Sequence, residues 1–392
     1  MKIEEVRVIQ LTFKHPPGHL WEKGEVSALG WDQVIVEVRT DDGLVGYGES
    51  YHMKNPYTIA AVIRDTFAPM LIGRDPFSIE QIWQNLFQRT QQLGSAAIGA
   101  LSGIDTALHD IISKSLGLPL YKFLGGADGF RARAYVGGHA LGWREVDNLD
   151  DLIDEATRYV NAGFKALKLR GGRALPHPGD VESVRALRSA FGNSIDILVD
   201  ANGEYLDYKT ARHMAEVLAE FDVYWLESPF TFSTAFHPEE LARLSQESPI
   251  RIASGGSTFG RFGLQRLLDA GGSDIIMANV SKAGGISETK KLHAMISAHN
   301  GKLSPHTDGG VNAYSNLHSF ASAPPHIIDG MYFEWDPVWP FSSAFVNPPR
   351  LVDGWIVVPD VPGLGVELID GIEDEYAMEP GTWFKQQLIR SR

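Results

Sequence analysis

The sequence predicts an α/β protein in which a (β/α) barrel follows an α+β domain. In the middle of the chain, short apolar runs alternate with helical patterns, which is typical of βα units and a parallel sheet. The polar residues near the ends of these runs recur at even intervals. The first 130 residues differ, because their strand-like segments come first and their helices follow. These three observations favour a barrel with a second domain before it.

Length and composition exclude several classes of protein. A chain of 392 residues with 44% apolar residues can bury a full core, and two domains are the default. The net charge of -14 argues against a nucleic-acid partner, which requires a basic face. With no cysteine, disulfides, thiolate metal sites and a cysteine nucleophile are excluded. The start alternates like a strand, and no run reaches the roughly 20 apolar residues of a membrane helix, so we expect a soluble cytoplasmic protein.

Residues 1–130 predict the α+β domain. The segments KIEEVRVIQL and DQVIVEVRTDDGLVGYGES are strand-like, and TDDG is a turn signal. The stretch ALSGIDTALHDIISKSLGLPLYKFLGG then predicts helix. We expect this domain to end near residue 130.

Residues 131–340 predict the barrel. RARAYVGGH at 131–139 is the candidate first strand, and the later strands are FKALKLR, IDILVD, VYWLES, IRIASG, DIIMANV, GKLSPH and MYFEW. The residues at or near the strand ends, at positions 168, 200, 227, 256, 279, 306 and 334, are separated by 32, 27, 29, 23, 27 and 28 residues, and all of them except Gly256 are polar. This spacing fits a barrel better than an open sheet, and barrel enzymes carry their chemistry at the carboxyl ends of the strands. Residues 341–392 are rich in proline and glycine, and we expect them to fold back on the N-terminal domain.

Two acids mark the predicted rim. Asp200 and Glu227 end consecutive strands, so their carboxylates point into the opening at the carboxyl ends of the barrel strands, called the mouth below. There they repel each other unless a cation lies between them. A hard divalent ion with oxygen ligands, above all magnesium, is the natural partner. The alternative is that each acid caps the following helix, although glutamate is a poor cap.

Four further polar residues are candidates for the same mouth. Strand alternation places Lys168 and Arg170 on one face, with a solvated surface pair as the alternative. His306 follows the strand KLSP, and the alternative is an ordinary loop histidine. Glu334 lies between two aromatic residues, where burial is expected to raise its pKa.

Several stretches together resemble the enolase superfamily, mandelate racemase subgroup. They are the helical stretch from ALSGIDTAL to LYKFLGG, DAN at 200–202, WLESP, KAGGISE at 282–288, and PGLGVE at 362–367. The resemblance covers essentially the whole chain. It implies a modified TIM barrel, (β/α)₇β, under an α+β capping domain. It also implies magnesium held by acids on three successive strands, and removal of the proton next to a carboxylate to give an enediolate.

The resemblance implies a role for each matching residue. Asp200 and Glu227 match the first two metal ligands, and His306 matches the acid/base histidine. Glu334 matches the acid that hydrogen-bonds the substrate carboxylate, and Lys168 matches the first lysine of a paired-lysine motif. It further implies a small-molecule carboxylate as substrate and a homo-oligomer, either a dimer or an octamer.

Three positions depart from the pattern of the family. Gly256 stands where the third metal acid is expected, Arg170 replaces the second lysine, and Asn279 replaces the aspartate that orients the histidine. Asn279 can still hydrogen-bond the imidazole, but it cannot balance an imidazolium charge. Two acids should also bind metal more weakly than three, with Asn202 or water completing the shell.

The chemistry of these residues favours a sugar-acid dehydratase. Racemisation needs a base on each face of the substrate, and arginine is a poor base near neutral pH. Loss of a β-hydroxyl needs one base and one acid, and His306 can serve as both in turn. Arg170 then clamps a carboxylate or stabilises charge. The alternatives are a non-catalytic relative that binds an acid sugar, and a racemase or epimerase.

Substrate contacts are expected from the capping domain and the first strand. Trp21, His52 and Lys54 lie in segments that should line the pocket, and His139 follows the first barrel strand. The alternative for each is an ordinary exposed loop residue. The identity of the acid sugar is left open by residue types alone.

Overall fold

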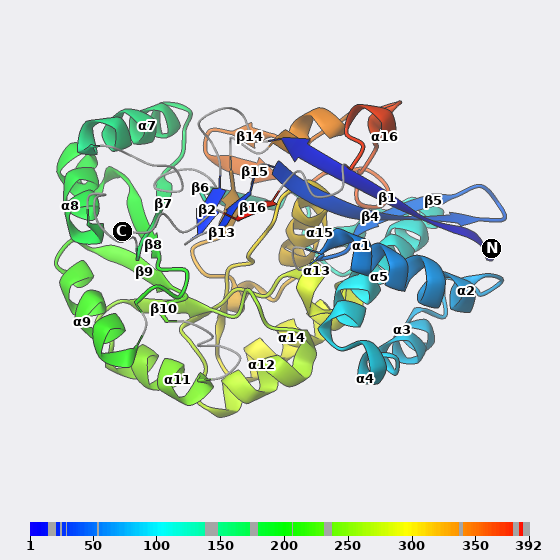
Figure 1. Cartoon of the computed structure of the whole chain (residues 1–392), viewed down its shortest axis with the longest axis horizontal. Coiled ribbons are helices and arrows are strands. Elements are labelled where there is room, and N and C mark those ends of the chain that lie inside the picture. The colour runs from blue at the N-terminus through cyan, green and yellow to red at the C-terminus, as the bar shows by residue number, and fades with distance from the viewer. Residues whose placement is uncertain are drawn as a thin grey trace.

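The computed structural model describes residues 1–14, 21–23, 26–28, 30–52, 55–137, 148–172, 179–205, 207–230, 237–336, 340–378 and 384–386. A capping domain, drawn in blue and cyan, lies beside a larger ring of strands and helices, drawn from green to orange (Figure 1). In the described part of the chain, no helix is both long and apolar enough to cross a membrane.

The capping domain is built on an antiparallel sheet in the order β1-β4-β5, with strands β1 (Ile3–Lys14), β4 (Gly30–Thr40) and β5 (Val45–Glu49). The long helix α5 (Ser95–Ser115) packs on this sheet, and its apolar residues share a buried cluster with Val34, Val36 and Val38. The remaining helical segments of the domain are α1 (Pro56–Ala61), a π-helical turn at 62–67, α2 (Ala68–Leu71), α3 (Ile79–Phe87), α4 (Thr90–Leu93) and α6 (Leu120–Phe123). A second small sheet joins β2 (Trp21–Lys23), β3 (Val26–Ala28) and β16 (Phe384–Gln386).

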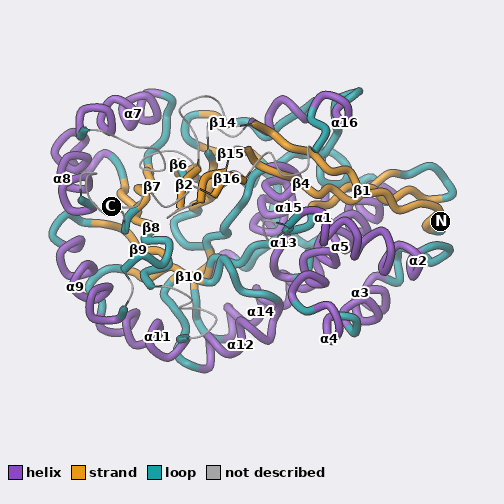
Figure 2. Tube along the Cα trace, viewed as in Figure 1, coloured by secondary structure: helices purple, strands orange, loops and turns teal. Residues whose placement is uncertain are grey.

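Within the described ranges, eight parallel strands form the barrel, and the trace in Figure 2 shows helices around them. The strands are β6 (Arg131–Val136), β7 (Ala166–Arg170), β8 (Asp196–Asp200), β9 (Val223–Glu227), β10 (Arg251–Ser254), β11 (Ile275–Ile276), β12 (Lys302–Leu303) and β13 (Tyr332–Trp335). The principal helices between them are α7 (Leu149–Asn161), α8 (Asp180–Phe191), α9 (Tyr208–Ala219), α11 (Pro238–Glu247), α12 (Gly260–Asp269), α14 (Ile286–Ala298) and α15 (Gly310–Ala321). Because β13 pairs with β6, the last strand closes on the first.

Strand alternation separates two layers of the barrel core. Side chains such as Leu198 and Trp225 fill the interior, whereas Leu167, Ile197 and Val199 pack between the strands and the helices. Successive strand residues point to opposite faces, so the residues of β7 that face inward with Ala166 are Lys168 and Arg170. The pattern ALKLR therefore turns two cations toward the barrel axis.

Two strands are shorter than the sequence pattern predicts, and one long helix was not anticipated. Just after β11, Met277 N donates a hydrogen bond to Ser254 O of β10 at 2.7 Å. Just after β12, Ser304 N donates to Ile276 O of β11 at 3.1 Å. Beyond them, Asn279 becomes the N-cap of the short helix α13 (Val280–Ala283). The unanticipated helix is α7, whose N-cap Asn148 accepts a hydrogen bond from the backbone N of Asp151.

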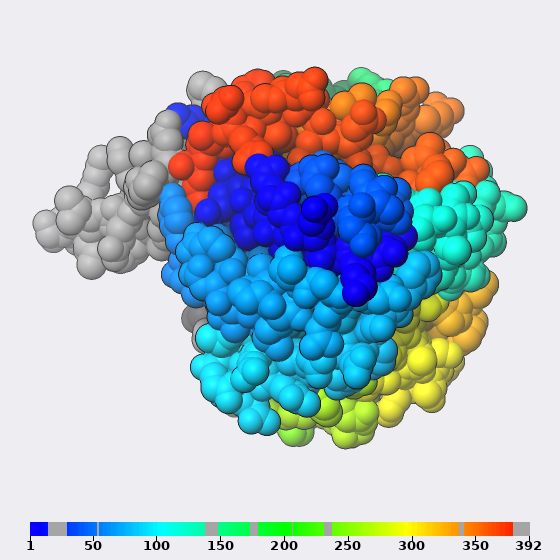
Figure 3. All heavy atoms as spheres, turned by 90° about the vertical axis from the view of Figure 1, so that its right-hand side faces the viewer, coloured from blue at the N-terminus to red at the C-terminus, as the bar shows by residue number. Residues whose placement is uncertain are grey.

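The segment after the barrel contacts the first strand of the capping domain. Figure 3 shows this segment, in orange-red, lying against the dark blue N-terminal strand. Leu11 forms a bridge with Ala377, and the ring of Phe13 packs against Phe341 and Tyr376. The hairpin of β14 (Leu351–Val352) and β15 (Trp355–Val357) pairs with β6 instead. The short helix α16 (Ile372–Glu375) completes this segment. The domain limits at residues 130 and 340 stay a prediction.

Candidate active site

The acids at the rim lie side by side because parallel pairing puts their strand ends at one level. Asp200 pairs with Arg170 on one side and with Glu227 on the other. Asp200 and Glu227 are 5% and 4% exposed, so both carboxylates are removed from water. Buried carboxylates need hydrogen bonds or opposite charges in such a position.

Lys168 supplies that opposite charge at the centre of the site. Its Nζ lies 2.8 Å from Glu334 Oε1, 3.2 Å from Glu227 Oε2 and 3.7 Å from Asp200 Oδ2. The lysine is only 4% exposed, and its Nζ also lies 5.5 Å from the centre of the Tyr135 ring. One buried ammonium group therefore holds three carboxylates from three strands.

Burial and the charges around Lys168 act on the pKa values of the lysine and of the three acids in opposing directions. Burial alone would lower the pKa of Lys168, but the charges of Glu227, Glu334 and Asp200 raise it above the usual value, so the ammonium stays charged. Burial, with Asp200 beside it, raises the pKa of Glu227 to about 8. Among these acids, Glu227 is therefore the one that most readily takes up a proton.

Arg170 forms an ion pair with Asp200. Its guanidinium NH1 lies 2.6 Å from Asp200 Oδ2, and Asp200 Oδ1 accepts a hydrogen bond from the backbone N of Asn202 at 2.8 Å. Burial would raise the pKa of Asp200, but Arg170 and then Lys168 lower it below the usual value. Asp200 is thus held as a carboxylate.

Glu334 comes from the last strand and meets the first. A Cβ atom at Gly137 would lie 2.4 Å from Glu334 Oε1, so no larger residue fits there without displacing the carboxylate. Burial would raise the pKa of Glu334, but the charge of Lys168 lowers it, against the sequence-based expectation of a raised value. Thr307 N donates a long hydrogen bond of 3.4 Å to Glu334 Oε2.

His306 belongs to a second polar group at the same mouth. Asn279 Nδ2 lies 3.1 Å from His306 Nδ1 and donates to Asp308 Oδ2 at 2.8 Å. Asp308 Oδ2 is 3.9 Å from His306 Nδ1 and 3.3 Å from Lys282 Nζ. Burial, followed by the charge of Lys282, lowers the pKa of His306. The imidazole is therefore biased toward its neutral form.

Asp308 is the functional candidate that sequence reasoning missed. Burial would raise its pKa, but Lys282 and His306 lower it to about 2, so it is charged. The sequence did carry a signal, because an acid stands two residues after the histidine in PHTD. Only the folded chain shows that this acid turns back toward the imidazole.

The capping domain reaches this second group. Lys282 Nζ lies 4.5 Å from the ring centre of Tyr51, and Glu49 Oε2 accepts a hydrogen bond from Asn312 N at 2.9 Å. Trp31, Glu49, Tyr51 and His52 from the capping domain line a pocket of about 40 Å³ together with Ser281 and Asp308. The predicted substrate residue His52 thus lies at this interface, where its Nε2 is 3.0 Å from Asp32 O.

Gly256 faces the histidine. A Cβ atom at this position would lie 3.3 Å from the Cβ, Cγ and Cδ2 atoms of His306. Position 256 therefore points into the mouth, where the family pattern places a third acid. Two other predicted positions, His139 and Lys54, lie outside the described residues, and so does the side chain of Trp21 in β2.

The acidic side chains at the mouth fit a magnesium site that has fewer protein ligands than the family pattern implies. Asp200 and Glu227 offer carboxylate oxygens of the type that magnesium prefers. Across the described ranges, no group of three or more histidine or acidic side chains is arranged to hold a metal ion. Lys168 and Arg170 already contact the carboxylates that such an ion would use. The residues fit two carboxylate ligands, not three.

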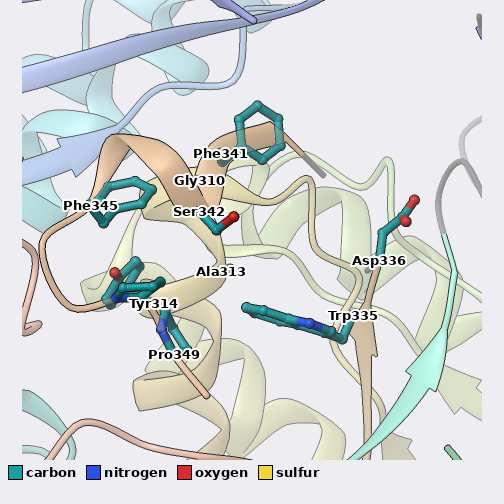
Figure 4. A pocket seen from close by; sticks show the side chains of 10 residues that line it. Gly310, Ala313, Tyr314, Trp335, Asp336, Phe341, Ser342, Phe345 and Pro349 are labelled. Carbon is teal, nitrogen blue, oxygen red and sulfur yellow. The ribbon is translucent and has the colours of Figure 1, made fainter. Parts of the chain in front are cut away.

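A larger pocket lies beside the last strand. It has a volume of about 120 Å³ and is lined by Trp335 and Asp336, which follow Glu334, and by Tyr314, Phe341 and Phe345. Figure 4 shows these aromatic rings around the pocket, between α15 and the segment near residue 341. None of the charged groups around Lys168 lines it.

Comparison with known families decides the relationship. Residues 151–372 match the family model described as enolase C-terminal domain-like, and residues 25–125 match the mandelate racemase/muconate lactonizing enzyme N-terminal domain. The chain belongs to the enolase superfamily. This enolase-superfamily protein has the expected fold, a capping sheet joined to a parallel barrel.

The curated relatives of this superfamily member include sugar-acid dehydratases and a lactone cycloisomerase. It is 33% identical to the arabinonate dehydratase of Saccharolobus solfataricus, over 88% of this chain and 90% of the relative. It is 32% identical to the D-galactarolactone cycloisomerase of Agrobacterium fabrum, over 88% and 91%. It is 31% identical to the D-galactonate dehydratase of Verminephrobacter eiseniae, over 89% and 92%.

Solved structures of other superfamily members superpose over nearly the whole chain. An enolase-superfamily member from a Polaromonas species has a TM-score of 0.86 at 34% identity, covering 97% of this chain and 99% of the other. A putative mandelate racemase from Bordetella bronchiseptica, complexed with 2-oxoglutarate/phosphate, has a TM-score of 0.86 at 31% identity, covering 99% and 100%. A Streptomyces coelicolor racemase with bound magnesium has a TM-score of 0.82 at 29% identity, covering 93% and 97%.

Proposed function

We propose that the protein is a dehydratase of a sugar acid, either an aldonate or an aldarate. The proposal rests on the ion pair between Arg170 and Asp200, in which the guanidinium NH1 lies 2.6 Å from Asp200 Oδ2. His306 lies at the same mouth, and its pKa is lowered. An arginine held in an ion pair cannot serve as a second base, so a reaction that needs one proton-transfer group is favoured over racemisation. The dehydratases among the relatives support the same class of reaction.

The proposed reaction is an elimination. His306 removes the proton from the carbon next to the substrate carboxylate, and the electron pair forms an enediolate. The hydroxyl on the neighbouring carbon then leaves as water, taking its proton from His306. The resulting enol becomes a 2-keto-3-deoxy acid. His306 ends in its starting protonation state, so the reaction consumes no external acid or base.

Magnesium is part of the proposal, with Asp200 and Glu227 as the residues that would hold it. A bound magnesium ion would supply positive charge that stabilises negative charge developing on the substrate. With two carboxylates in place of three, and with Lys168 at 3.2 Å from Glu227, we expect weaker binding than a three-acid site gives. Titration with manganese, followed by anomalous scattering, tests this location. An empty rim at high metal concentration would contradict it.

The activity is tested with a panel of aldonic acids, aldaric acids and their lactones, with and without magnesium. The expected result is a keto acid from at least one member of the panel, and none from the His306→Asn protein. Lactones are included because one relative is a cycloisomerase. If ligands raise the melting temperature but none is converted, the protein is a non-catalytic binder of acid sugars.

A further inference from the structure

The orientation of the Asn279 side chain is fixed by the donors that face its Oδ1 atom. Its Oδ1 accepts hydrogen bonds from the backbone N of Ser281, from the Ser281 hydroxyl and from Asn312 Nδ2, each at 2.9 Å. A backbone N–H can only donate, so the atom facing Ser281 must be the oxygen. The amide nitrogen of Asn279 therefore faces the opposite way, toward His306 and Asp308.

This orientation determines which nitrogen of His306 carries the proton. Asn279 Nδ2 lies 3.1 Å from His306 Nδ1, and an amide nitrogen has no lone pair to offer as an acceptor. The hydrogen bond exists only if Nδ1 accepts it. In a neutral imidazole, the single proton is then on Nε2.

Asp308 lies next to this hydrogen bond without forming one to the ring. Its Oδ2 accepts from Asn279 Nδ2 at 2.8 Å and is 3.9 Å from His306 Nδ1, beyond hydrogen-bonding distance. Lys282 holds the same carboxylate at 3.3 Å, and Asp308 N donates to Asn312 Oδ1 at 2.9 Å. A small movement of the ring would bring Nδ1 to Asp308 instead of Asn279.

We infer that Asn279 is a positioning residue that holds neutral His306 with its proton on Nε2, and that Asp308 is the acceptor when Nδ1 carries a proton. The resting histidine then presents a donor at Nε2, suited to a departing hydroxyl. Removal of a substrate proton at Nε2 requires the form protonated on Nδ1, which arises when water gives a proton to Nδ1 and takes one from Nε2, and Asp308 stabilises that form. The tautomer is a property of the free protein, and only its part in the reaction rests on the proposed function.

Nitrogen-15 spectroscopy of labelled histidine tests the tautomer without turnover. A ring nitrogen that carries a proton and one that does not have well-separated ¹⁵N shifts, and the His306→Gln protein identifies the signals of His306. At a pH of about 8, where histidine is ordinarily neutral, we expect a protonated Nε2 and a bare Nδ1. A protonated Nδ1 in the wild-type protein would overturn the inference.

A charge-preserving exchange supplies the matched control. The double variant Asn279→Asp with Asp308→Asn moves the carboxylate to the position the family uses and leaves the net charge unchanged. We expect its His306 to change to the Nδ1-protonated form, whereas Asp308→Asn alone keeps the proton on Nε2. If the exchange leaves the tautomer unchanged, Asn279 does not set it. If the double variant does not fold, the wild-type spectrum still decides.

A correct tautomer with no turnover on any sugar acid would remove the proposed function and leave this inference intact. The opposite result, turnover with a protonated Nδ1 in the free protein, would remove the inference alone.

Discussion

Lys168 contacts three carboxylates, and its charge should be the main force that keeps them together. Lys168→Met retains much of the side-chain volume and removes the charge, leaving buried acids with Arg170 as the remaining cation beside Asp200. Removing one partner of a buried ion pair typically costs about 3–5 kcal/mol. We expect a lower melting temperature, with the largest loss above a pH of about 8, where Glu227 is charged together with Asp200 and Glu334.

The measurement is thermal unfolding across a range of pH. As the pH falls, the carboxylates of the variant take up protons and the deficit relative to wild type should shrink. Lys282→Met is the matched control, because this buried lysine pairs with one acid, Asp308, and its loss should cost less. Equal losses for the two variants would show that the three-acid network has no special weight.

His306 is expected to control rate more than binding. His306→Asn should abolish measurable turnover and change ligand affinity by no more than a few fold, because proton transfer is needed only on the way through the transition state. The measurement is kcat together with ligand affinity from calorimetry. Retention of most of the activity would place the base elsewhere.

Gly256→Glu restores an acid to the position that faces His306. A Cβ there lies 3.3 Å from three ring and side-chain carbons of His306, so the imidazole must shift by a few tenths of an ångström. Without metal the added negative charge should destabilise the protein, and with magnesium the added oxygen should tighten binding. We expect a larger magnesium-dependent rise in melting temperature than in wild type.

The control for this experiment is Gly256→Gln, which has nearly the same size and no charge. It should show the steric cost without the gain from magnesium. A rise in Gly256→Glu that is equal to or smaller than that of wild type would mean that position 256 does not face the ion.

At the residue scale, the sequence identified most of the acids and cations that lie at the mouth. It did not predict which cation pairs with which acid. Lys168, Asp200 and Glu227 lie together because strand alternation and parallel register can be read from short apolar runs. The role of Asp308 depends on the path of the loop after β12, and periodicity carries no information about that path. Sequence spacing also gave no sign that Lys168 would contact all three acids at once.

At the scale of elements, the sequence predicted the helices between strands well and two strand lengths poorly. β11 and β12 have two residues each, because the chain leaves the ladder early to form α13 and the loop of His306. Helix α7 was missed although Asn148 and the acids after it form a clear N-terminal signal.

His318 joins three elements and should make their contact sensitive to acid. Its Nδ1 accepts a hydrogen bond from Tyr121 N in α6 at 3.0 Å, and its Nε2 lies 3.1 Å from Leu364 O. Burial lowers the pKa of His318 to about 4. A proton on Nδ1 would face the N–H of Tyr121, so the folded state resists protonation.

The sign of the effect follows from this lowered pKa. Above a pH of about 6.5 the residue is neutral in both the folded and the unfolded state, and its stabilisation is fully present. Between about 6.5 and 4 the unfolded state takes up the proton first, so the free energy of unfolding falls as the solution becomes more acidic. His318→Asn should unfold more easily at neutral pH and lose less stability across this interval, as measured by urea denaturation. The same substitution at the exposed His213 should leave the wild-type pH dependence in place.

At the scale of the whole molecule, the capping domain and the barrel share buried contacts at the KAGG stretch. Trp83 from α3 is 1% exposed, and its Nε1 donates to Gly284 O at 2.7 Å. Trp83→Phe keeps an aromatic ring and leaves the Gly284 carbonyl without this donor, which typically costs about 1–3 kcal/mol. We expect a lower urea midpoint and one cooperative transition, followed by circular dichroism. Tyr57→Phe, at an exposed position of α1, should leave the midpoint unchanged.

The two-domain arrangement could be predicted because its signals are spread over the whole chain. Alternating strands and helices over residues 131–340 predict a barrel whatever the details of each loop. The sequence predicted only that residues 341–392 fold back on the N-terminal domain. The contact of Leu11 with Ala377 could not be predicted, because pairing between distant segments leaves no local pattern.

The position of Asp308 on the same short stretch as His306 has a consequence for protein recombination. In a relative whose aspartate stands at the position of Asn279, the imidazole and its carboxylate are encoded about as far apart as β11 and the loop after β12. Here both are inherited within three residues, 306–308. A chimaera that takes this stretch from the present chain would carry a histidine together with its own acid, and its other strands could come from any compatible barrel. A shuffling boundary between positions 279 and 306 would therefore keep the histidine and its acid together in this protein, and would separate them in such a relative.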